Sequence, residues 1–371
     1  MDVKELKTQL QEISGYLQKF ARNEKFRKYC ERKINEYYAS YDNEIMKKIA
    51  HMEIDPKLWK FGTDGKFVRN REDIILDNFK FFESLDSIYA GDINLENEAR
   101  NNFKYIKISE GNKRSSCGYK TPDEGEIERK IVWSISGTVL DSCVLAHELT
   151  HSFGTNFKFA RSEFKDVRLK EMCSCITNQL YLEWEKQQYP DIQKPISRAQ
   201  ALITNNAKIK ALLPEMDVDI CTAISKKYGD IRIRRIFEKY FPEINDWDYE
   251  DVGRTSQNML NYLVCIKNDI YKDFQANDCS LRFKPFFDAL YVENCIIAEA
   301  FLEKFKKSPK EAVKSFKEVI KNGTTMTQSE AVEKLGLGNI KELVDDFCRN
   351  YNQNGFKKMN ESLRKDAEKQ M

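Results

Sequence analysis

The sequence predicts a mainly α-helical protein with one small β-sheet, and three features of its pattern support this fold class. Apolar residues recur at helical spacing over most of the chain, among dense Lys and Glu. Two β-type runs, residues 103–108 and 130–135, flank a turn-rich stretch. After Thr138 nearly every segment is helical in pattern again. We therefore expect an N-terminal helical region, residues 1–100, followed by a domain at residues 101–371 that begins with the sheet.

The first hundred residues are predicted to be helical with one interruption. Helical spacing of apolar residues between residues 3 and 52 predicts two amphipathic helices. Pro56, Gly62 and Gly65 break this pattern, and it returns through residues 71–89.

Two helices near the end of the chain have recognisable start signals. Ser308 is followed by Pro309 and Glu311, which is typical of a helix N-terminus. Thr327 precedes Glu330 by three residues, a spacing that predicts a capping box, and Gly336 is positioned to end that helix.

The composition and charge of the chain argue against several classes of function. The 371 residues are 41% hydrophobic and 12% aromatic, which is enough for a substantial core. Lys and Arg total 61 against 59 Asp and Glu, so the charge balance does not favour a nucleic-acid partner or an acidic membrane surface. No apolar run approaches the roughly 18 residues of a membrane span, and the first residues lack the apolar segment of a signal peptide. We expect a cytoplasmic protein without membrane or nucleic-acid partners.

Ten cysteines are scattered along the chain, many of them within apolar helical patterns. Without an export signal, reduced and buried thiols are the expected state rather than a disulfide framework.

The segment VLAHELTHSFG holds two of the three histidines of the chain. On a helix, His147 and His151 lie on one face a turn apart, so both imidazoles can bind one metal ion. Glu148 lies beside that face, where its carboxylate can act as a general base on a metal-bound water. Chance would produce this HExxH arrangement on the order of once in several hundred such chains.

A catalytic zinc site needs a third protein ligand and an open fourth position. Because His151 is the last histidine, the third ligand must be a carboxylate or a thiolate. Glu171 lies 20 residues later within an apolar helical stripe, where a carboxylate needs a partner. Four nearby residues are alternatives: Glu163, Asp166, Cys173 and Cys175. A C-x-C pair in an apolar helix more often belongs to the core.

Four blocks, in this order along the chain, resemble the oligoendopeptidase F and thimet oligopeptidase family of HExxH zinc metallopeptidases. They are SEGNKRSSCGYKT before the second β-type run, SGTVLDSCVLAHELTHSF around the histidines, KEMCSCITNQLYL around Glu171, and the segment of residues 291–339. In the third block Ser174 matches a small polar residue of the family. The resemblance covers about residues 103–344. It implies a zincin-like catalytic domain that binds one Zn²⁺ per chain through His147, His151 and Glu171.

The resemblance also implies an activity and a peptide substrate. The chain would be a zinc-dependent endopeptidase or oligopeptidase that hydrolyses short or unfolded peptides. Glu148 would deprotonate the attacking water and pass the proton to the leaving amine. The chain is short for this family, and the expected missing part is the N-terminal helical wall of a substrate channel, so a wider cleft is one expectation. The sequence does not indicate an oligomeric state.

One stretch departs from the family pattern. The family places a histidine and several tyrosines before its C-terminal helices, where they stabilise the oxyanion. Here Leu281 or Arg282 occupies the histidine position, Phe287 and Ala289 occupy two tyrosine positions, and Tyr291 remains. The oxyanion donor is then Tyr291, Arg282 or absent. The alternative function is a catalytically weakened member that keeps zinc as a structural or peptide-binding centre.

Overall fold

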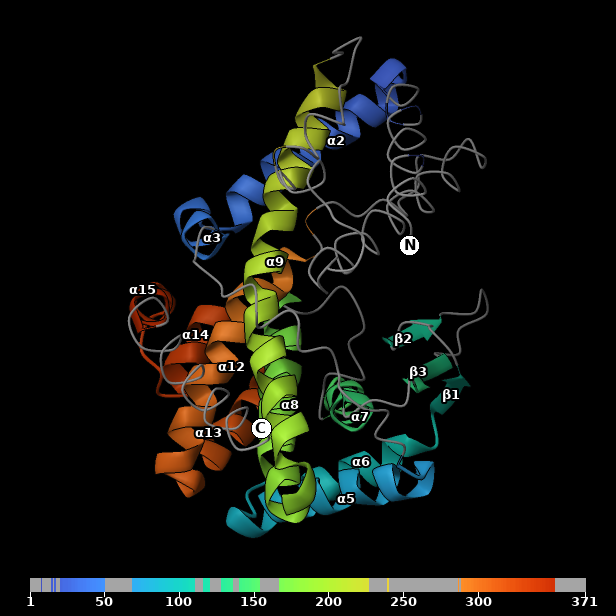
Figure 1. Cartoon of the computed structure of the whole chain (residues 1–371), viewed down its shortest axis with the longest axis vertical. Coiled ribbons are helices and arrows are strands. Elements are labelled where there is room, and N and C mark those ends of the chain that lie inside the picture. Colours follow the sequence, from blue (N-terminus) through green and yellow to red (C-terminus); the bar gives the residue numbers. More distant parts are fainter. Residues whose placement is uncertain are drawn as a thin grey trace, which may run out of the picture. The chain divides into compact units, whose positions relative to one another are not determined.

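The computed structural model of the chain is mainly α-helical with one small sheet, which confirms the predicted fold class (Figure 1). It describes residues 8, 15, 17, 21–50, 69–110, 116–120, 128–135, 140–153, 167–226, 239, 286 and 288–350. The chain forms two compact units. One comprises Met1–Gly62, Lys208–Val292 and Asn354–Met371, and the other comprises Thr63–Ala207 and Glu293–Gln353. These units do not test where a catalytic domain begins, so the boundary at residue 100 stays a prediction.

The first unit contains helices α2 (Glu24–Ser40) and α3 (Asn43–Ala50) and the later part of α9 (Gln193–Ser225). The Asn23 side chain accepts a hydrogen bond from the Phe26 amide and so caps the start of α2. Tyr37 of α2 stacks on Phe286, with ring centroids 4.5 Å apart. Helices α2 and α3 occupy the second half of the predicted range of residues 3–52, and most of residues 3–20 lie outside the described residues.

The sheet of the second unit has three strands in the order β1-β3-β2. Strand β1 (Ile106–Glu110) pairs in parallel with β3 (Glu128–Ile135), and β2 (Ser116–Lys120) pairs with β3 in antiparallel fashion. The prediction of two strands was incomplete, because β2 lies in the stretch predicted to be turns. The sequence of β2 does not show a β-type pattern. Pairing with β3 supplies its backbone hydrogen bonds, and the local sequence does not indicate that pairing. The first strand begins at Ile106 rather than Phe103, because Phe103 ends helix α6 (Leu95–Phe103).

Aromatic packing joins the helices of this unit to one another. Helices α5 (Arg71–Ile88), α7 (Leu140–Thr150) and α8 (Val167–Gln188) meet here, and a short 3₁₀ turn, Pro190–Ile192, follows α8. Phe82 of α5 contacts Phe153 edge-on at 4.9 Å between ring centroids, and Phe81 contacts Tyr181 of α8 at 5.1 Å. These buried rings set the packing of the three helices.

The last strand positions the helix that follows it. The buried Trp133 of β3 donates its indole N–H to the carbonyl oxygen of Asp141 at 2.9 Å. Because Asp141 lies in the first turn of α7, this bond ties the sheet to the start of the helix that carries the histidines.

The C-terminal helices are α12 (Ala289–Lys307), α13 (Pro309–Asn322), α14 (Gln328–Lys334) and α15 (Ile340–Asn350). The capping box of Thr327 and Glu330 is confirmed, and Pro309 is the first residue of α13, although the side chain of Ser308 makes no capping hydrogen bond. Gly336 has a φ of 68°, and its N–H donates to the Glu333 carbonyl at 2.8 Å. This is the left-handed turn that was predicted to end α14.

Two further expectations concern cysteines and membrane spans. The seven cysteines whose side chains the structure describes are thiols rather than halves of disulfides, and all but Cys348 are buried. Within the described ranges, no helix combines the length and the apolar character that crossing a bilayer requires.

A buried ionic network ties α5, α7 and α8 together. Arg69 forms an ion pair with Asp77 of α5 and lies 2.8 Å from Glu185 Oε1 of α8. The Ser142 hydroxyl of α7 donates to the same oxygen at 3.0 Å. Burial raises the pKa of Glu185 to about 7, although the Arg69 guanidinium and Ser142 oppose the shift. Because burial outweighs both partners, Glu185 holds its proton more tightly in the folded chain than in the unfolded chain.

The first prediction is that Glu185 makes stability fall as pH rises. Its ordinary pKa is near 4.5 and its folded pKa is about 7, so the folded state binds the proton more tightly between these values. This contribution is fully present below pH 4.5 and is lost as pH rises through 7. In urea titrations, the free energy of unfolding of the native chain should fall between pH 5 and pH 8. The corresponding fall for Glu185→Gln should be smaller by on the order of 2 kcal/mol.

Glu183 on the same helix is the matched control. It pairs with Lys186 at 2.8 Å, and although burial acts to raise its pKa, the hydrogen bond from Lys186 holds the pKa below its ordinary value. Glu183→Gln should therefore leave the loss of stability above pH 5 in place. Equal pH profiles for Glu185→Gln and the native chain would contradict the prediction.

Candidate metal centre

Helix α7 places the two histidines on one face. His147 lies within α7, and His151 follows its last residue, Thr150, but continues the helical turn because its N–H donates to the His147 carbonyl at 3.2 Å. The apolar neighbours Leu145 and Leu149 are fully buried. The i, i+4 arrangement predicted from the sequence is therefore present.

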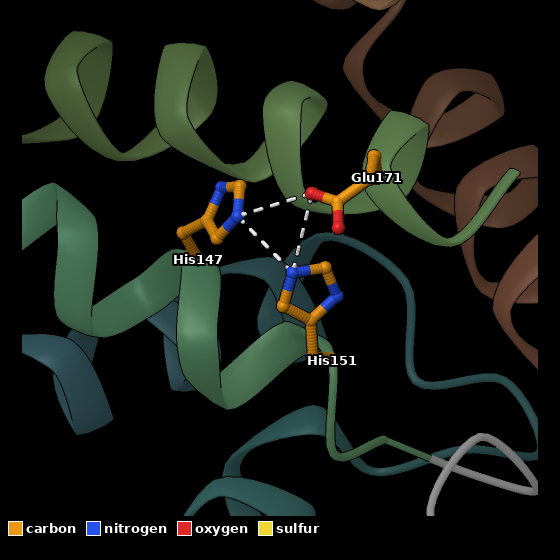
Figure 2. Close-up of side chains that lie close together, drawn as sticks. All are labelled: His147, His151 and Glu171. Atoms are coloured by element: carbon orange, nitrogen blue, oxygen red, sulfur yellow. Dashed lines mark hydrogen bonds and ion pairs between the residues drawn. The ribbon is translucent and has the colours of Figure 1, made fainter. Parts of the chain in front are cut away.

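Helix α8 brings a carboxylate to these imidazoles. The Nε2 atoms of His147 and His151 are 3.1 Å apart, and Oε2 of Glu171 lies 3.6 Å and 3.5 Å from them, respectively. Figure 2 shows the three side chains turned toward a common point from two separate helices. Among the described residues, these three form the group whose ligand atoms lie close enough together to hold one metal ion.

The three atoms fit a zinc ion in spacing and in type. A tetrahedral zinc with bonds of about 2.1 Å has ligand atoms roughly 3.4 Å apart, and the observed distances of 3.1, 3.5 and 3.6 Å lie around that value. Glu171 Oε2 is buried and accepts no hydrogen bond within the described part of the chain. A buried carboxylate oxygen facing two imidazole nitrogens is a suitable acceptor for a divalent cation.

The protonation states also suit metal binding. Burial lowers the pKa of His151 to about 4, so its imidazole is neutral at pH 7. Burial acts to raise the pKa of Glu171, but the adjacent imidazoles of His151 and His147 outweigh it and hold that pKa well below the ordinary range. The cluster therefore presents a neutral imidazole and an ionised carboxylate, the forms that bind metal.

The alternative third ligands lie elsewhere. Cys173 and Cys175 are buried on α8 and are not part of the cluster, and burial raises the pKa of Cys173 to about 12, which keeps it a thiol. Glu163 and Asp166 lie outside the described residues.

The structure describes three of the other residues named from the sequence and leaves others out. Glu148 is buried on α7, with 6% of its surface exposed. Tyr291 lies in the first turn of α12, where the Lys210 ammonium is 3.6 Å from its ring centroid. Ala289 is the buried first residue of α12. Leu281, Arg282 and Phe287 lie outside the described residues.

Helix α8 also contacts the outer edge of both imidazoles, which the motif alone does not predict. Ser174 Oγ is 3.0 Å from Nδ1 of His151, and Asn178 Nδ2 is 3.1 Å from Nδ1 of His147. Their positions relative to Glu171 are i+3 and i+7, a spacing that places all three residues on one helix face. That spacing is the signal in the sequence that identifies Asn178 as a neighbour of the site.

Comparison with known proteins supports the fold. The chain matches no protein-family model and no curated protein. Its fold is similar to that of solved structures at low sequence identity.

Two solved structures illustrate this likeness. One is PZ peptidase A with inhibitor 2, which is 18% identical with a TM-score of 0.51 and is matched over 79% of this chain. The other is a protein assigned as an oligoendopeptidase F, which is 13% identical with a TM-score of 0.52 and is matched over 77% of this chain. The matched part spans 49% of each of those chains, about half their length. At these identities the likeness supports the family resemblance at the level of the fold.

The second prediction concerns metal affinity. Glu171→Gln replaces the carboxylate with a neutral amide of the same shape, so Zn²⁺ affinity should fall by more than about 100-fold. The measurement is competition with a chromophoric chelator. Glu183→Gln on the same helix is the control and should bind Zn²⁺ like the native chain. Equal affinities for Glu171→Gln and Glu183→Gln would remove Glu171 from the proposed ligand set.

Proposed function

We propose that this chain is a zinc-dependent endopeptidase or oligopeptidase that hydrolyses peptide bonds in short or unfolded peptides. The observation that carries the proposal is the convergence of His147, His151 and Glu171 within 3.6 Å of one another. The fold shared with two peptidases supports it. The scattered thiols of the described cysteines are in keeping with a cytoplasmic location, which is part of the proposal.

The proposed ligands are His147, His151 and Glu171, which hold one Zn²⁺ per chain. Bound there, zinc would polarise the scissile carbonyl and lower the pKa of water. Glu148 follows His147 directly on α7 and is the proposed general base. Its carboxylate takes a proton from the attacking water and delivers it to the nitrogen of the leaving amine. The two transfers leave Glu148 in its starting form.

Tyr291 is the proposed oxyanion donor, on the basis of the family resemblance. Its phenol O–H would donate to the oxygen of the tetrahedral intermediate, which carries negative charge only after attack. Arg282 is the alternative donor. In the catalytically weakened alternative no donor remains, and the zinc serves as a structural or peptide-binding centre.

The third prediction tests the base. Glu148→Gln keeps the shape of the side chain and removes its proton acceptor, so cleavage of a quenched fluorescent peptide library should fall by about 100-fold or more. Zinc content, measured by atomic emission, should remain that of the native chain. If the native chain cleaves no peptide but binds zinc, the catalytically weakened alternative replaces the proposal. Equal cleavage by Glu148→Gln and the native chain would exclude Glu148 as the base.

The fourth prediction tests the oxyanion donor. Tyr291→Phe removes only the hydroxyl and keeps the ring beneath the Lys210 ammonium. Because the donor acts on a charge that forms after attack, kcat should fall by about 100-fold while KM changes little. Lys210→Met, which removes the cation and keeps the hydroxyl, is the control and should retain kcat. An unchanged kcat in Tyr291→Phe would transfer the role to Arg282, which Arg282→Met tests in the same assay.

A further inference from the structure

The outer nitrogens of both proposed ligand imidazoles face polar side chains of α8. Ser174 is fully buried, and its hydroxyl lies 3.0 Å from His151 Nδ1. Asn178 is half-buried, and its side-chain amide lies 3.1 Å from His147 Nδ1. One face of α8 thus carries the proposed ligand Glu171. The same face carries Ser174 and Asn178, which contact the imidazoles of the other two proposed ligands.

Metal binding makes a specific demand on these neighbours. A neutral imidazole carries one N–H, and the nitrogen that binds metal must present its lone pair. The Nε2 atoms face Glu171, so each Nδ1 must carry the hydrogen and needs an acceptor. The hydroxyl oxygen of Ser174 can accept directly.

The amide of Asn178 can meet this demand in one of its two orientations. As placed, Nδ2 faces His147, and the buried Oδ1 accepts no hydrogen bond from any described residue. A half-turn about the last side-chain bond exchanges the two atoms and presents Oδ1 to His147 Nδ1. No hydrogen bond to Oδ1 opposes that rotation within the described part of the chain.

We propose that Ser174 and Asn178 are positioning residues that hold His151 and His147 in the Nδ1–H tautomer, with Asn178 accepting through Oδ1. The proposal rests on the proposed metal site. Each residue orients an imidazole ring and directs the Nε2 lone pair at the ion, while neither contacts the ion itself. Loss of such an outer hydrogen bond typically weakens metal binding by about 10- to 100-fold.

The fifth prediction is tested by Zn²⁺ affinity in chelator competition, independently of activity. Asn178→Leu and Ser174→Ala should each weaken binding by about 10- to 100-fold. Glu183→Gln is the control on the same helix, because the Glu183 carboxylate pairs with Lys186 and the variant should bind Zn²⁺ like the native chain. Affinities of Asn178→Leu and Ser174→Ala that match Glu183→Gln would overturn the proposal.

Asn178→Asp tests whether the side chain at this position accepts a hydrogen bond from His147 or donates one to it, because a carboxylate can only accept. It also lowers the net charge by one. Lys170→Gln lowers the net charge near His151 by the same amount and leaves both hydrogen bonds in place. Asn178→Asp should bind Zn²⁺ at least as tightly as Lys170→Gln. Weaker binding would show that Asn178 acts as a donor and would overturn its proposed role.

Labelled-histidine NMR of the zinc-loaded chain provides a second measurement, since only three histidines contribute signals. The Nδ1–H of His147 should resist exchange in the native chain and in Asn178→Asp, and lose that protection in Asn178→Leu. Protection unchanged in Asn178→Leu would overturn the proposal. If the native chain binds no zinc, the proposed function fails. If it binds zinc and the variants match the control, only the positioning role fails.

Discussion

The packing of α7 against α8 is the constraint on which the rest of the site depends. His147 lies in α7, His151 continues its last turn, and Glu171 lies in α8, so the separation of the proposed ligands is set by how the two helices meet. Polar contacts fix both ends of that interface. Near the start of α7, Ser142 donates to Glu185, and near its end the hydroxyls of Thr150 and Thr177 lie 2.9 Å apart. Slippage of α7 along α8 would break buried hydrogen bonds at both ends, and buried polar groups left without partners are costly.

The surrounding elements hold this helix pair from outside. Trp133 of the sheet bonds to the first turn of α7, and the Asn102 side chain of α6 donates to the Ser152 carbonyl just beyond its last turn, at 3.1 Å. Phe81 and Phe82 of α5 add apolar contacts to α8 and to Phe153. The small sheet matters for the site because it holds the start of α7, while α6 holds the end of that helix. A rigid support of this kind is what a precise three-ligand site requires.

Local sequence rules predicted the features that depend on local spacing. The HExxH segment, the capping box at Thr327 and the turn at Gly336 each involve residues within one or two helical turns, so their geometry follows from the helix itself. Glu171 was found because a carboxylate in an apolar stripe needs a partner. The missed features depend on distant contacts. Strand β2 forms because β3 is available to pair with it, and Arg69 becomes buried because Asp77 and Glu185 meet it from two helices. No pattern within either segment carries that information.

The donor set itself distinguishes an open zinc centre from a closed structural one. Structural zinc sites are closed by four ligands and are usually rich in thiolates, whereas three ligands of the His₂Glu type leave a coordination position for water or substrate. Four thiolates would more than neutralise Zn²⁺. The proposed ligands, two neutral imidazoles and the Glu171 carboxylate, would instead leave about one positive charge on the ion, and that charge would polarise a carbonyl. The cysteines nearest in the sequence, Cys173 and Cys175, are buried in the core and stay outside the cluster. The chain thus has thiols close to Glu171 in the sequence that are not part of the cluster, and this set of proposed ligands favours the peptidase proposal over a purely structural zinc.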